Sequence, residues 1–251
     1  MLPAYEAGES LAGFTRMVQL SLYYAAHGIV RHRNPKSRLF DVLVYPPEHG
    51  SFEWILEVIT DPSRFGAIAN GLITNGIYDF IKYITQRVTG QPSDIRDQTA
   101  LKLIDTKAAD IEAVLDAIEP SAKRFHTPIG NGATNALVIN GDGNTINFNA
   151  GTKEYVNTSV KNIDPRGKVF RISALNVNSG HGRAFDNEER RSFPFQIIDK
   201  AAPDTRKVVA GSLNRYANET DPWIRLEYTS VDGPNGRVKK LLVHGATAVA
   251  R

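Results

Sequence analysis

The sequence contains no cysteine, and this absence excludes several classes of protein at once. Without thiols the chain cannot form the disulfide framework of a small secreted domain, a thiolate zinc site, an iron–sulfur cluster or a cysteine nucleophile. The chain also has no run of about 18 uninterrupted apolar residues, which is the length that a membrane-spanning helix needs. Residues 1–6 lack the basic segment and the apolar core of a signal peptide. We therefore expect a soluble cytoplasmic protein.

Positive charge is in small excess and is unevenly distributed. The 251 residues carry 30 Lys and Arg against 27 Asp and Glu, a net charge of +3. Residues 1–151 hold 13 cations against 16 acids, whereas residues 152–251 hold 17 cations against 11 acids. A change of sign between the two halves points to an anionic partner for the basic half. The alternative is a solvated surface that carries a few additional arginines.

The first 120 residues predict an α+β domain with the element order α-β-β-α-α. Apolar residues recur at spacings of three and four from Leu11 to Ala25, which predicts a helix that Gly28 ends. Alternating residues at 40–45 and 52–58, on either side of a Pro/Gly turn at 46–50, predict a hairpin. We expect one face of its second strand to cover the helix. That face carries Phe52, Trp54, Leu56 and Val58.

Two further helices are expected before residue 120. Asp61-Pro62 is a helix start signal, and the stretch 77–88 has a clear apolar face that Gly90 ends. A last helical stretch begins at Pro92, and we expect Pro120 to stop it. Residues 126–153 are rich in Asn and Gly. There Asn140-Gly-Asp-Gly143 between two apolar runs predicts a small β-ribbon, which should pack on a neighbour or on another copy.

The last hundred residues change to a β pattern with a single helix. Strands are expected at 168–177, from 183, at 193–198, 223–228 and 238–244, and a helix at 205–219. The helix should bury Val208, Val209, Leu213 and Tyr216. Three strands, a helix and two strands is the element order of an OB-type barrel. The alternative is an SH3-like or unclassified small β domain. The predicted domains are therefore 1–125 (α+β), 126–153 (linker with ribbon) and 154–251 (basic, OB-like barrel).

Basic and aromatic residues alternate along the predicted barrel strands, which is the combination that holds single-stranded nucleic acid. The candidate residues for binding nucleic acid or another anion are Arg171, His181, Arg183, Arg190, Arg191, Arg225, Arg237, Lys239 and Lys240. The aromatic residues among them are Phe170, Phe185, Phe193, Phe195, Trp223 and Tyr228. Most of these rings must form the core of the domain, so at most one or two could be exposed platforms.

Catalysis has little support in the sequence. The six histidines are scattered without the i, i+4 spacing of a helical metal site, and there is no P-loop, dinucleotide fingerprint or nucleophile elbow. We therefore expect no metal, no cofactor and no catalytic residue. The loop Asn176-Val-Asn-Ser-Gly-His-Gly-Arg183 is the exception to consider, because it could bind an anion, present a catalytic imidazole, or be a plain tight turn.

Several sequence blocks resemble an uncharacterised bacterial domain family. They are Ala7–Arg16, Tyr45–Glu53, Tyr78–Lys82, Asn176–Arg183, Phe193–Phe195 and Gly236–Lys239. The segment Gly141–Asn147 is similar to linkers between modules of bacterial anti-phage proteins. The resemblance implies an accessory protein of bacterial defence or of a mobile element, and it transfers no catalytic residue.

Together these patterns favour a non-enzymatic adaptor whose basic C-terminal domain contacts nucleic acid or another anionic ligand. The alternative is a homo-oligomeric assembly module that pairs through residues 135–149 and the 40–58 hairpin and binds no nucleic acid. A third reading is an enzyme that uses His181 and Arg183.

Overall fold

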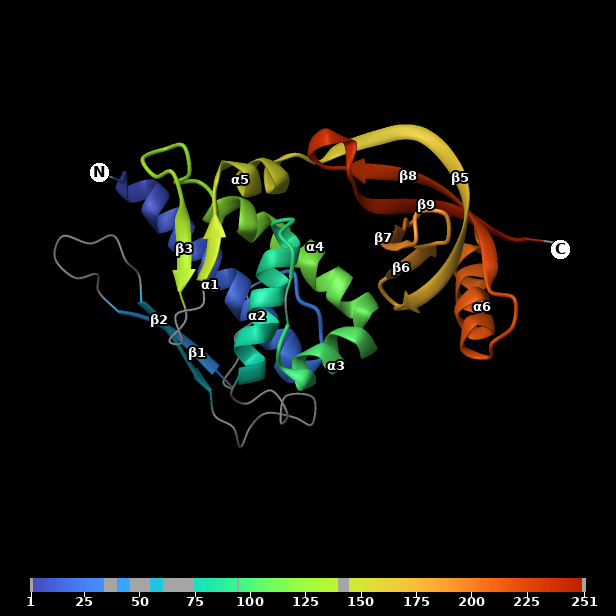
Figure 1. Ribbon diagram of the computed structural model, residues 1–251, viewed down its shortest axis with the longest axis horizontal. Coiled ribbons are helices and arrows are strands. Elements are labelled where there is room, and N and C mark those ends of the chain that lie inside the picture. The colour runs from blue at the N-terminus through green and yellow to red at the C-terminus, as the bar shows by residue number, and fades with distance from the viewer. Residues whose placement is uncertain are drawn as a thin grey trace. The chain divides into compact units, whose positions relative to one another are not determined.

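The computed structural model describes residues 2–33, 40–45, 55–60, 75–93, 95–139 and 145–249 (Figure 1). The chain divides into two compact units. The first unit is Met1–Asp105 with Val114–Asn157, and the second is Thr106–Ala113 with Thr158–Arg251. The domain limits that the sequence suggested, at residues 125 and 153, stay predictions. None of the helices in the described ranges is long and apolar enough to cross a membrane.

Helices make up most of what the structure describes in the first 157 residues. In chain order the elements are α1 (Ala4–His27), β1 (Phe40–Tyr45), β2 (Ile55–Thr60), α2 (Asn75–Val88), α3 (Gln98–Thr106), α4 (Ala108–Phe125), β3 (Ala136–Ile139), β4 (Thr145–Phe148) and α5 (Ala150–Asn157). The predicted apolar stripe of α1 is confirmed, because Phe14, Val18 and Leu22 are all buried. Gly28 ends this helix in a left-handed conformation, with φ of 65°, and donates its N–H to the carbonyl of Tyr24.

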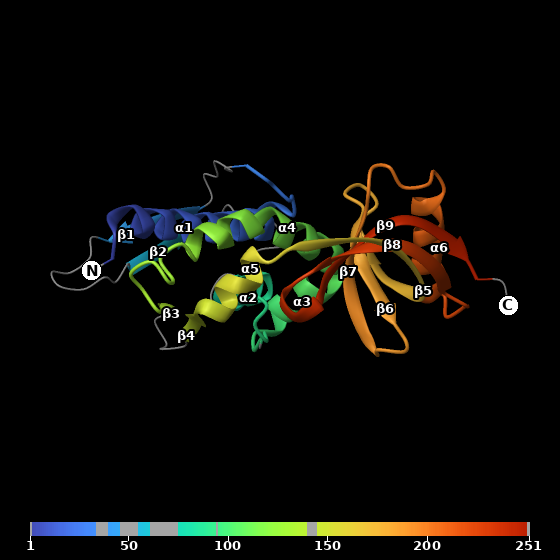
Figure 2. The same cartoon turned by 90° about the horizontal axis from the view of Figure 1, so that it is seen from above.

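α1 and the C-terminal part of α4 pack closely, and they run side by side in Figure 2. The contact is made at Gly13, where an added Cβ would lie 2.5 Å from the backbone nitrogen of Phe125. Beside it, Ser10 Oγ donates to the carbonyl of Phe125 at 2.9 Å, and the rings of Phe14 and Phe125 lie 5.4 Å apart. The missing side chain at Gly13 therefore sets the distance between the two helices.

The prediction that Pro120 stops a helix is wrong, because α4 continues through it to Phe125. Proline removes one backbone hydrogen bond from a helix interior, and tertiary packing can compensate for that loss. Here Ile118 and Ala122 on either side of the proline are fully buried. The single helical stretch expected from Pro92 is in fact two helices, α3 and α4, which are separated at Lys107.

The predicted hairpin corresponds to an antiparallel two-stranded sheet in which Phe40 of β1 is opposite Thr60 of β2. The expected turn at 46–50, the strand residues 52–54 and the helix start at Asp61 lie outside the described residues, and so does the face that should cover the helix.

The predicted Asn/Gly ribbon is confirmed as the antiparallel pair of β3 and β4, while its turn at 140–144 lies outside the described residues. Its inner face packs on a neighbour, as expected, because the Phe148 ring lies 4.8 Å from Phe125 and 5.5 Å from His126. The helix α5 was not predicted. Asn149 caps it by accepting hydrogen bonds from the N–H groups of Gly151 and Thr152.

The second unit contains a closed five-stranded barrel. Its elements are β5 (Val160–Leu175), β6 (His181–Asp186), β7 (Arg191–Ile197), α6 (Thr205–Ala217), β8 (Trp223–Asp232), the short 3-10 helix η2 (Pro234–Gly236) and β9 (Val238–Ala248). The strand order around the barrel is β5-β6-β7-β9-β8, with β8 again next to β5. Only the β7–β9 pair is parallel among these strand pairs. The helix α6 packs against β5, β9 and β8 (Figure 2).

The barrel core is built from alternate residues of each strand. The fully buried members include Phe170, Ile172, Phe195, Ile224, Leu226 and Val243. Strand β5 begins at Val160, eight residues before the expected start at 168, and it runs through Asp164-Pro165. In the structure these residues form an irregularity within the strand, between Asn162 and Arg166. A bulge of this kind lets one long strand bend and pair along its length.

Candidate anion-binding surface of the barrel

The nine candidate residues lie on several parts of the barrel rather than on one face. Their places are β5 (Arg171), β6 (His181, Arg183), the β6–β7 turn and the start of β7 (Arg190, Arg191), β8 (Arg225), the residue after η2 (Arg237) and β9 (Lys239, Lys240). The contacts of each residue show whether its side chain supports the fold or is available to bind a ligand.

Arg171 is held between two aromatic rings. Its guanidinium carbon lies 4.6 Å from the ring centre of Phe185 and 4.1 Å from that of Tyr216. Tyr216, which the helix pattern placed on the buried side of α6, is 39% exposed and covers this guanidinium. Such stacking fixes the side chain through cation–π attraction and packing. Arg171 therefore joins α6 to the outer side of β5 and β6.

His181 and Arg183 are also engaged inside the second unit. His181 is only 6% exposed, and its Nδ1 lies 3.2 Å from the carbonyl oxygen of Ser179, so Nδ1 carries a proton and donates it. Arg183 Nε donates to the carboxylate of Glu112 at 2.9 Å. The loop before His181 is an Asn-capped turn, because the Asn176 side chain accepts the N–H groups of Asn178 and Ser179.

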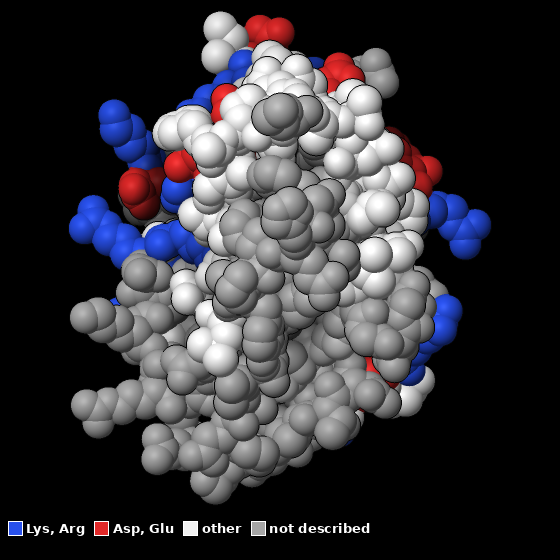
Figure 3. All heavy atoms as spheres, turned by 90° about the vertical axis from the view of Figure 1, so that its left-hand side faces the viewer, with Lys and Arg blue, Asp and Glu red and all other residues white. Residues whose placement is uncertain are grey.

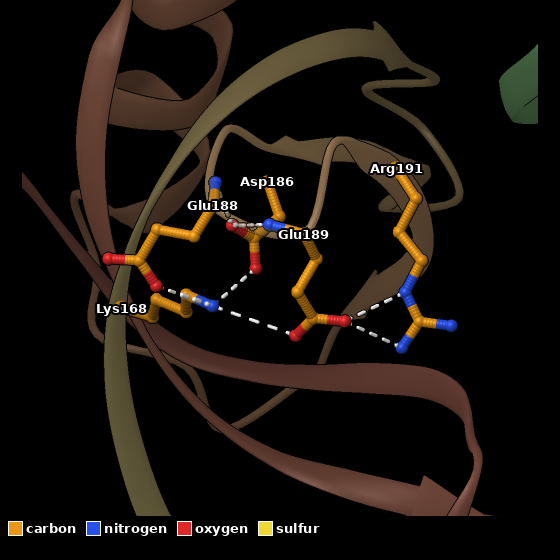
Figure 4. Close-up of polar contacts among 5 residues, drawn as sticks. All are labelled: Lys168, Asp186, Glu188, Glu189 and Arg191. Carbon is orange, nitrogen blue, oxygen red and sulfur yellow. Dashed lines mark hydrogen bonds and ion pairs between the residues drawn. The ribbon is translucent and has the colours of Figure 1, made fainter.

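A network of charges centred on Lys168 braces the β6–β7 turn (Figure 4). Lys168 Nζ lies 2.6 Å from Asp186, 3.0 Å from Glu188 and 3.6 Å from Glu189. Arg191 pairs with Glu189 at 2.8 Å. Lys168 was not among the candidates, because its partners lie about twenty residues further along the chain.

The pKa values in this network are shifted by the same contacts. The hydrogen bond to Asp186, together with that to Glu188, raises the pKa of Lys168 well above its ordinary value. Burial acts to raise the pKa of Asp186. The hydrogen bonds from Lys168 and from the N–H groups of Glu189 and Glu188 outweigh burial, so this pKa is lowered. Both groups therefore keep their charges near neutral pH, and the positive charge of Lys168 is compensated within the protein.

An open hollow of about 470 Å³ lies beside this network on the outer side of β5 and β8. It is lined by Gly167, Lys168, Val169, Asp186, Asn187, Glu188, Trp223, Arg225 and Val249. Trp223 and Arg225 are two residues apart on one strand, so their side chains share a face. Ile224 between them is buried in the core, so this shared face is the outer one. The sequence identified both side chains but could not place them in a common depression.

A second group of cations surrounds the β8–β9 turn, and we call it the basic end of the barrel. It consists of Lys161, Arg237, Lys239 and Lys240. Lys161 and Lys240 are both opposite Val231, one from β5 and one from β9, so all three side chains share a face. Lys239 Nζ donates to Ser159 Oγ at 3.2 Å, and Lys240 Nζ donates to Gln196 at 3.4 Å. Lys161 was not among the candidates, because the strand was expected to begin after it.

Four of the six aromatic candidates form the barrel core, namely Phe170, Phe193, Phe195 and Tyr228. Only Phe185 and Trp223 are partly exposed. Phe185 stacks on Arg171. Within the described part of the chain, no three His, Asp or Glu side chains come together in a way that could hold a metal ion.

Residues 1–157 match one protein-family model. No curated protein and no solved structure matches the chain. The match agrees with the resemblance to an uncharacterised family, and it ends before the barrel, so the blocks at 176–183, 193–195 and 236–239 lie outside it. A bacterial origin stays a prediction. Because the matched residues make up more than half of the sequence, the chain belongs to the family described as Domain of unknown function (DUF7946).

Proposed function

We propose that the barrel is an OB-type domain that binds single-stranded nucleic acid, and that the protein is a non-enzymatic adaptor. The strand order β5-β6-β7-β9-β8 supports the OB assignment, together with a helix between the third and fourth strands. The 16-residue strand β5 also supports it, because one bent strand pairs with both β6 and β8 and so closes the barrel. These features favour the OB-type over the SH3-like alternative.

The position of the basic end on the barrel is the main observation that supports nucleic acid as the ligand. OB-type domains bind oligonucleotides with the loop between the fourth and fifth strands, among other parts. In this barrel that loop is the β8–β9 turn, and Arg237, Lys239 and Lys240 lie in it or directly after it. Arg237 and Lys161 are exposed to solvent. Cations gathered at one end of a small barrel can contact successive phosphates of a strand.

The test is a salt titration of the full-length protein with a labelled 12-nucleotide single strand, followed by fluorescence anisotropy. We expect binding at low salt that weakens steeply as salt increases. Arg237→Gln with Lys240→Gln should weaken binding and reduce the slope of log affinity against log salt by about 0.7 for each phosphate that the protein no longer neutralises.

The matched control is Lys200→Gln with Lys207→Gln, which removes the same charge from exposed positions elsewhere on the second unit. It should leave the salt slope near that of the unmodified protein. Absence of binding at low salt, or an equal loss in both double variants, would show that the basic end is not a nucleic-acid surface.

Self-association is the second candidate function, and one specific observation favours it. On the outer face of β3, Leu137 is 58% exposed and Ile139 is 56% exposed. Figure 3 views the side that lies at the left of Figure 1, and there the described Lys, Arg, Asp and Glu side chains lie mainly toward the edges. Exposed apolar side chains on the outer face of a two-stranded ribbon favour contact with another protein surface.

Light scattering of the full chain over a range of concentrations tests this candidate. Leu137→Lys with Ile139→Lys should abolish any concentration-dependent increase in mass. Val177→Lys, at a 57% exposed position of the second unit, is the control and should not change it. A mass that stays monomeric at every concentration would refute the self-association candidate.

A further inference from the structure

The hollow on the outer side of β5 and β8 is lined by both an aromatic ring and a cation. These are Trp223 and Arg225, and the exposed side chains of Val169 and Val249 add apolar surface to the lining. Its volume of about 470 Å³ is within the range of small-ligand sites. A planar ring that stacks on Trp223 would leave its substituents within the same depression as the Arg225 guanidinium.

The guanidinium of Arg225 packs against a glycine and is not held by an acidic side chain. A Cβ at Gly167 would lie 2.6 Å from Arg225 Nη2 and 3.0 Å from its Cζ and Nε atoms. The side chain therefore lies against the bare backbone of β5, in a place that any other residue would fill. Among the described residues, no carboxylate forms an ion pair with Arg225. A guanidinium that is positioned but not neutralised is suited to bind a phosphate.

The other charged residues of the hollow, Lys168, Asp186 and Glu188, contact one another. Lys168 is shared by Asp186, Glu188 and Glu189, and this network ties β5 to the β6–β7 turn (Figure 4). The wall of the hollow is therefore held in place before any ligand arrives. Arg225 remains as the cation that can compensate an incoming negative charge.

We propose that this hollow holds one nucleotide of a bound single strand, with its base stacked on Trp223 and a phosphate on Arg225. The inference rests on the proposed function and adds to it the position of a base. The hollow and the basic end lie along the same two strands, because β5 and β8 pair from Val160 and Asp232 to Arg171 and Trp223. The six residue steps from Arg225 to Val231 span about 20 Å along β8.

This placement predicts a path for the strand along β5 and β8. The outer side of β6 is a less suitable route, because its cation Arg183 is paired and His181 is buried. Glu227 lies between the two proposed contacts, on the outward side of β8. The strand must therefore pass this carboxylate, and Glu227→Gln should strengthen binding slightly.

The experiment measures the affinity of the full-length protein for a 12-nucleotide strand and for an abasic strand with the same number of phosphates. Trp223→Leu should weaken binding of the normal strand by roughly 5- to 100-fold and should leave binding of the abasic strand unchanged. Trp223→Phe keeps an aromatic face and should restore most of the affinity. Trp223 fluorescence, observed in a Trp54→Phe background that leaves a single tryptophan, should be quenched by the normal strand only.

Gly167→Ala tests whether packing against Gly167 positions the Arg225 guanidinium, and it does so without removing a charge. The added methyl group meets only the end of a flexible side chain, so the barrel should fold and the guanidinium should be displaced. We expect Gly167→Ala and Arg225→Gln to weaken binding of the normal strand by similar factors. Lys200→Gln, which removes a cation elsewhere on the second unit, is the control and should have no effect.

The outcomes separate this inference from the proposed function. If the unmodified protein binds the strand, but Trp223→Leu, Gly167→Ala and Arg225→Gln all bind it equally well, the nucleotide site is refuted and the basic end remains. If both strands quench Trp223 equally, base stacking is refuted. If the unmodified protein binds neither strand at low salt, the proposed function and the nucleotide site both fail.

Discussion

Gly13 of α1 faces the backbone of Phe125 in α4, and an added Cβ would lie 2.5 Å from its nitrogen and 2.7 Å from the carbonyl oxygen of Ser121. Backbone atoms cannot move aside as a flexible side chain can, so Gly13→Ala should force the two helices apart. We expect a loss of about 1–3 kcal/mol in the free energy of unfolding, measured by urea denaturation.

Gly8 in the same helix provides the matched control. A Cβ at Gly8 would meet nothing within 4 Å, so Gly8→Ala should gain about 0.5–1 kcal/mol from helix propensity alone. If Gly13→Ala stabilised the protein as Gly8→Ala does, the close approach of α1 and α4 would be wrong.

The Lys168–Asp186 ion pair should contribute more to the free energy of unfolding than most ion pairs at a protein surface do. Asp186 has a side chain that is 1% exposed, so Lys168→Met leaves a buried carboxylate without its main partner. We expect a loss of about 1–3 kcal/mol, and a smaller loss when Asp186→Asn is combined with it. Glu188→Gln, at a side chain that is 81% exposed, should change stability by less than about 0.5 kcal/mol.

The pH dependence of this pair follows from its pKa shifts. The lowered pKa of Asp186 contributes stability above the unfolded-state pKa of about 3.9, and that contribution is lost as the pH falls through the folded-state pKa. The raised pKa of Lys168 contributes stability below about 10.4, and that contribution is lost as the pH rises through its folded-state value. The cost of Lys168→Met should therefore be constant between about pH 5 and 9. A cost that vanished in that range would contradict the ion pair.

Arg171 should prove to be a structural residue rather than a ligand contact. Its two ring contacts predict that Arg171→Ala costs about 1–2 kcal/mol of stability while oligonucleotide affinity is unchanged. Arg171→Lys keeps the charge but loses the flat stacking, so it should be destabilised as well. Weaker oligonucleotide binding by Arg171→Ala with unchanged stability would return this residue to the binding surface.

Much of the fold could be predicted because the relevant signals are local. The stripe from Leu11 to Ala25, the two apolar runs that form the ribbon of β3 and β4, and the strand–helix order of the last hundred residues depend on neighbours in sequence. The end of the helix at Pro120 and the start of the strand at 168 were predicted wrongly for the opposite reason. Their conformations are decided by packing on distant residues and by strand pairing, which local propensity does not encode.

The candidate site could be predicted only as a set of residue types. Basic and aromatic residues on strands are visible in the sequence, but their roles depend on what faces them. Arg171 lies between two rings, whereas Arg225 rests on a glycine from another strand, and nothing near either arginine in sequence distinguishes them. The hollow itself combines residues from 167 to 249, so it exists only after the barrel has closed.

His126 predicts a pH-dependent weakening of the first unit. The side chain is fully buried, its Nδ1 lies 2.7 Å from the carbonyl oxygen of Ala122, and its Nε2 lies 3.0 Å from Thr152 Oγ1. Burial lowers the pKa of His126, and the nearby positive charge of Lys153 acts in the same direction, while the hydrogen bond to Ala122 opposes it. The folded protein therefore holds this imidazole neutral, with its proton on Nδ1.

A lowered histidine pKa means that the unfolded chain binds the proton more readily than the folded chain does. Stability should be complete above the unfolded-state pKa of about 6.5 and should fall as the pH drops below it, until the folded-state pKa is reached. His126→Asn can still donate to Ala122 but does not titrate, so its stability should depend less on pH between 7 and 5. Side-chain NMR of the full chain provides the direct measurement, because the signal absent from His126→Asn identifies the residue. A titration midpoint above 6.5, or equal pH slopes for the two proteins, would show that burial does not control this histidine.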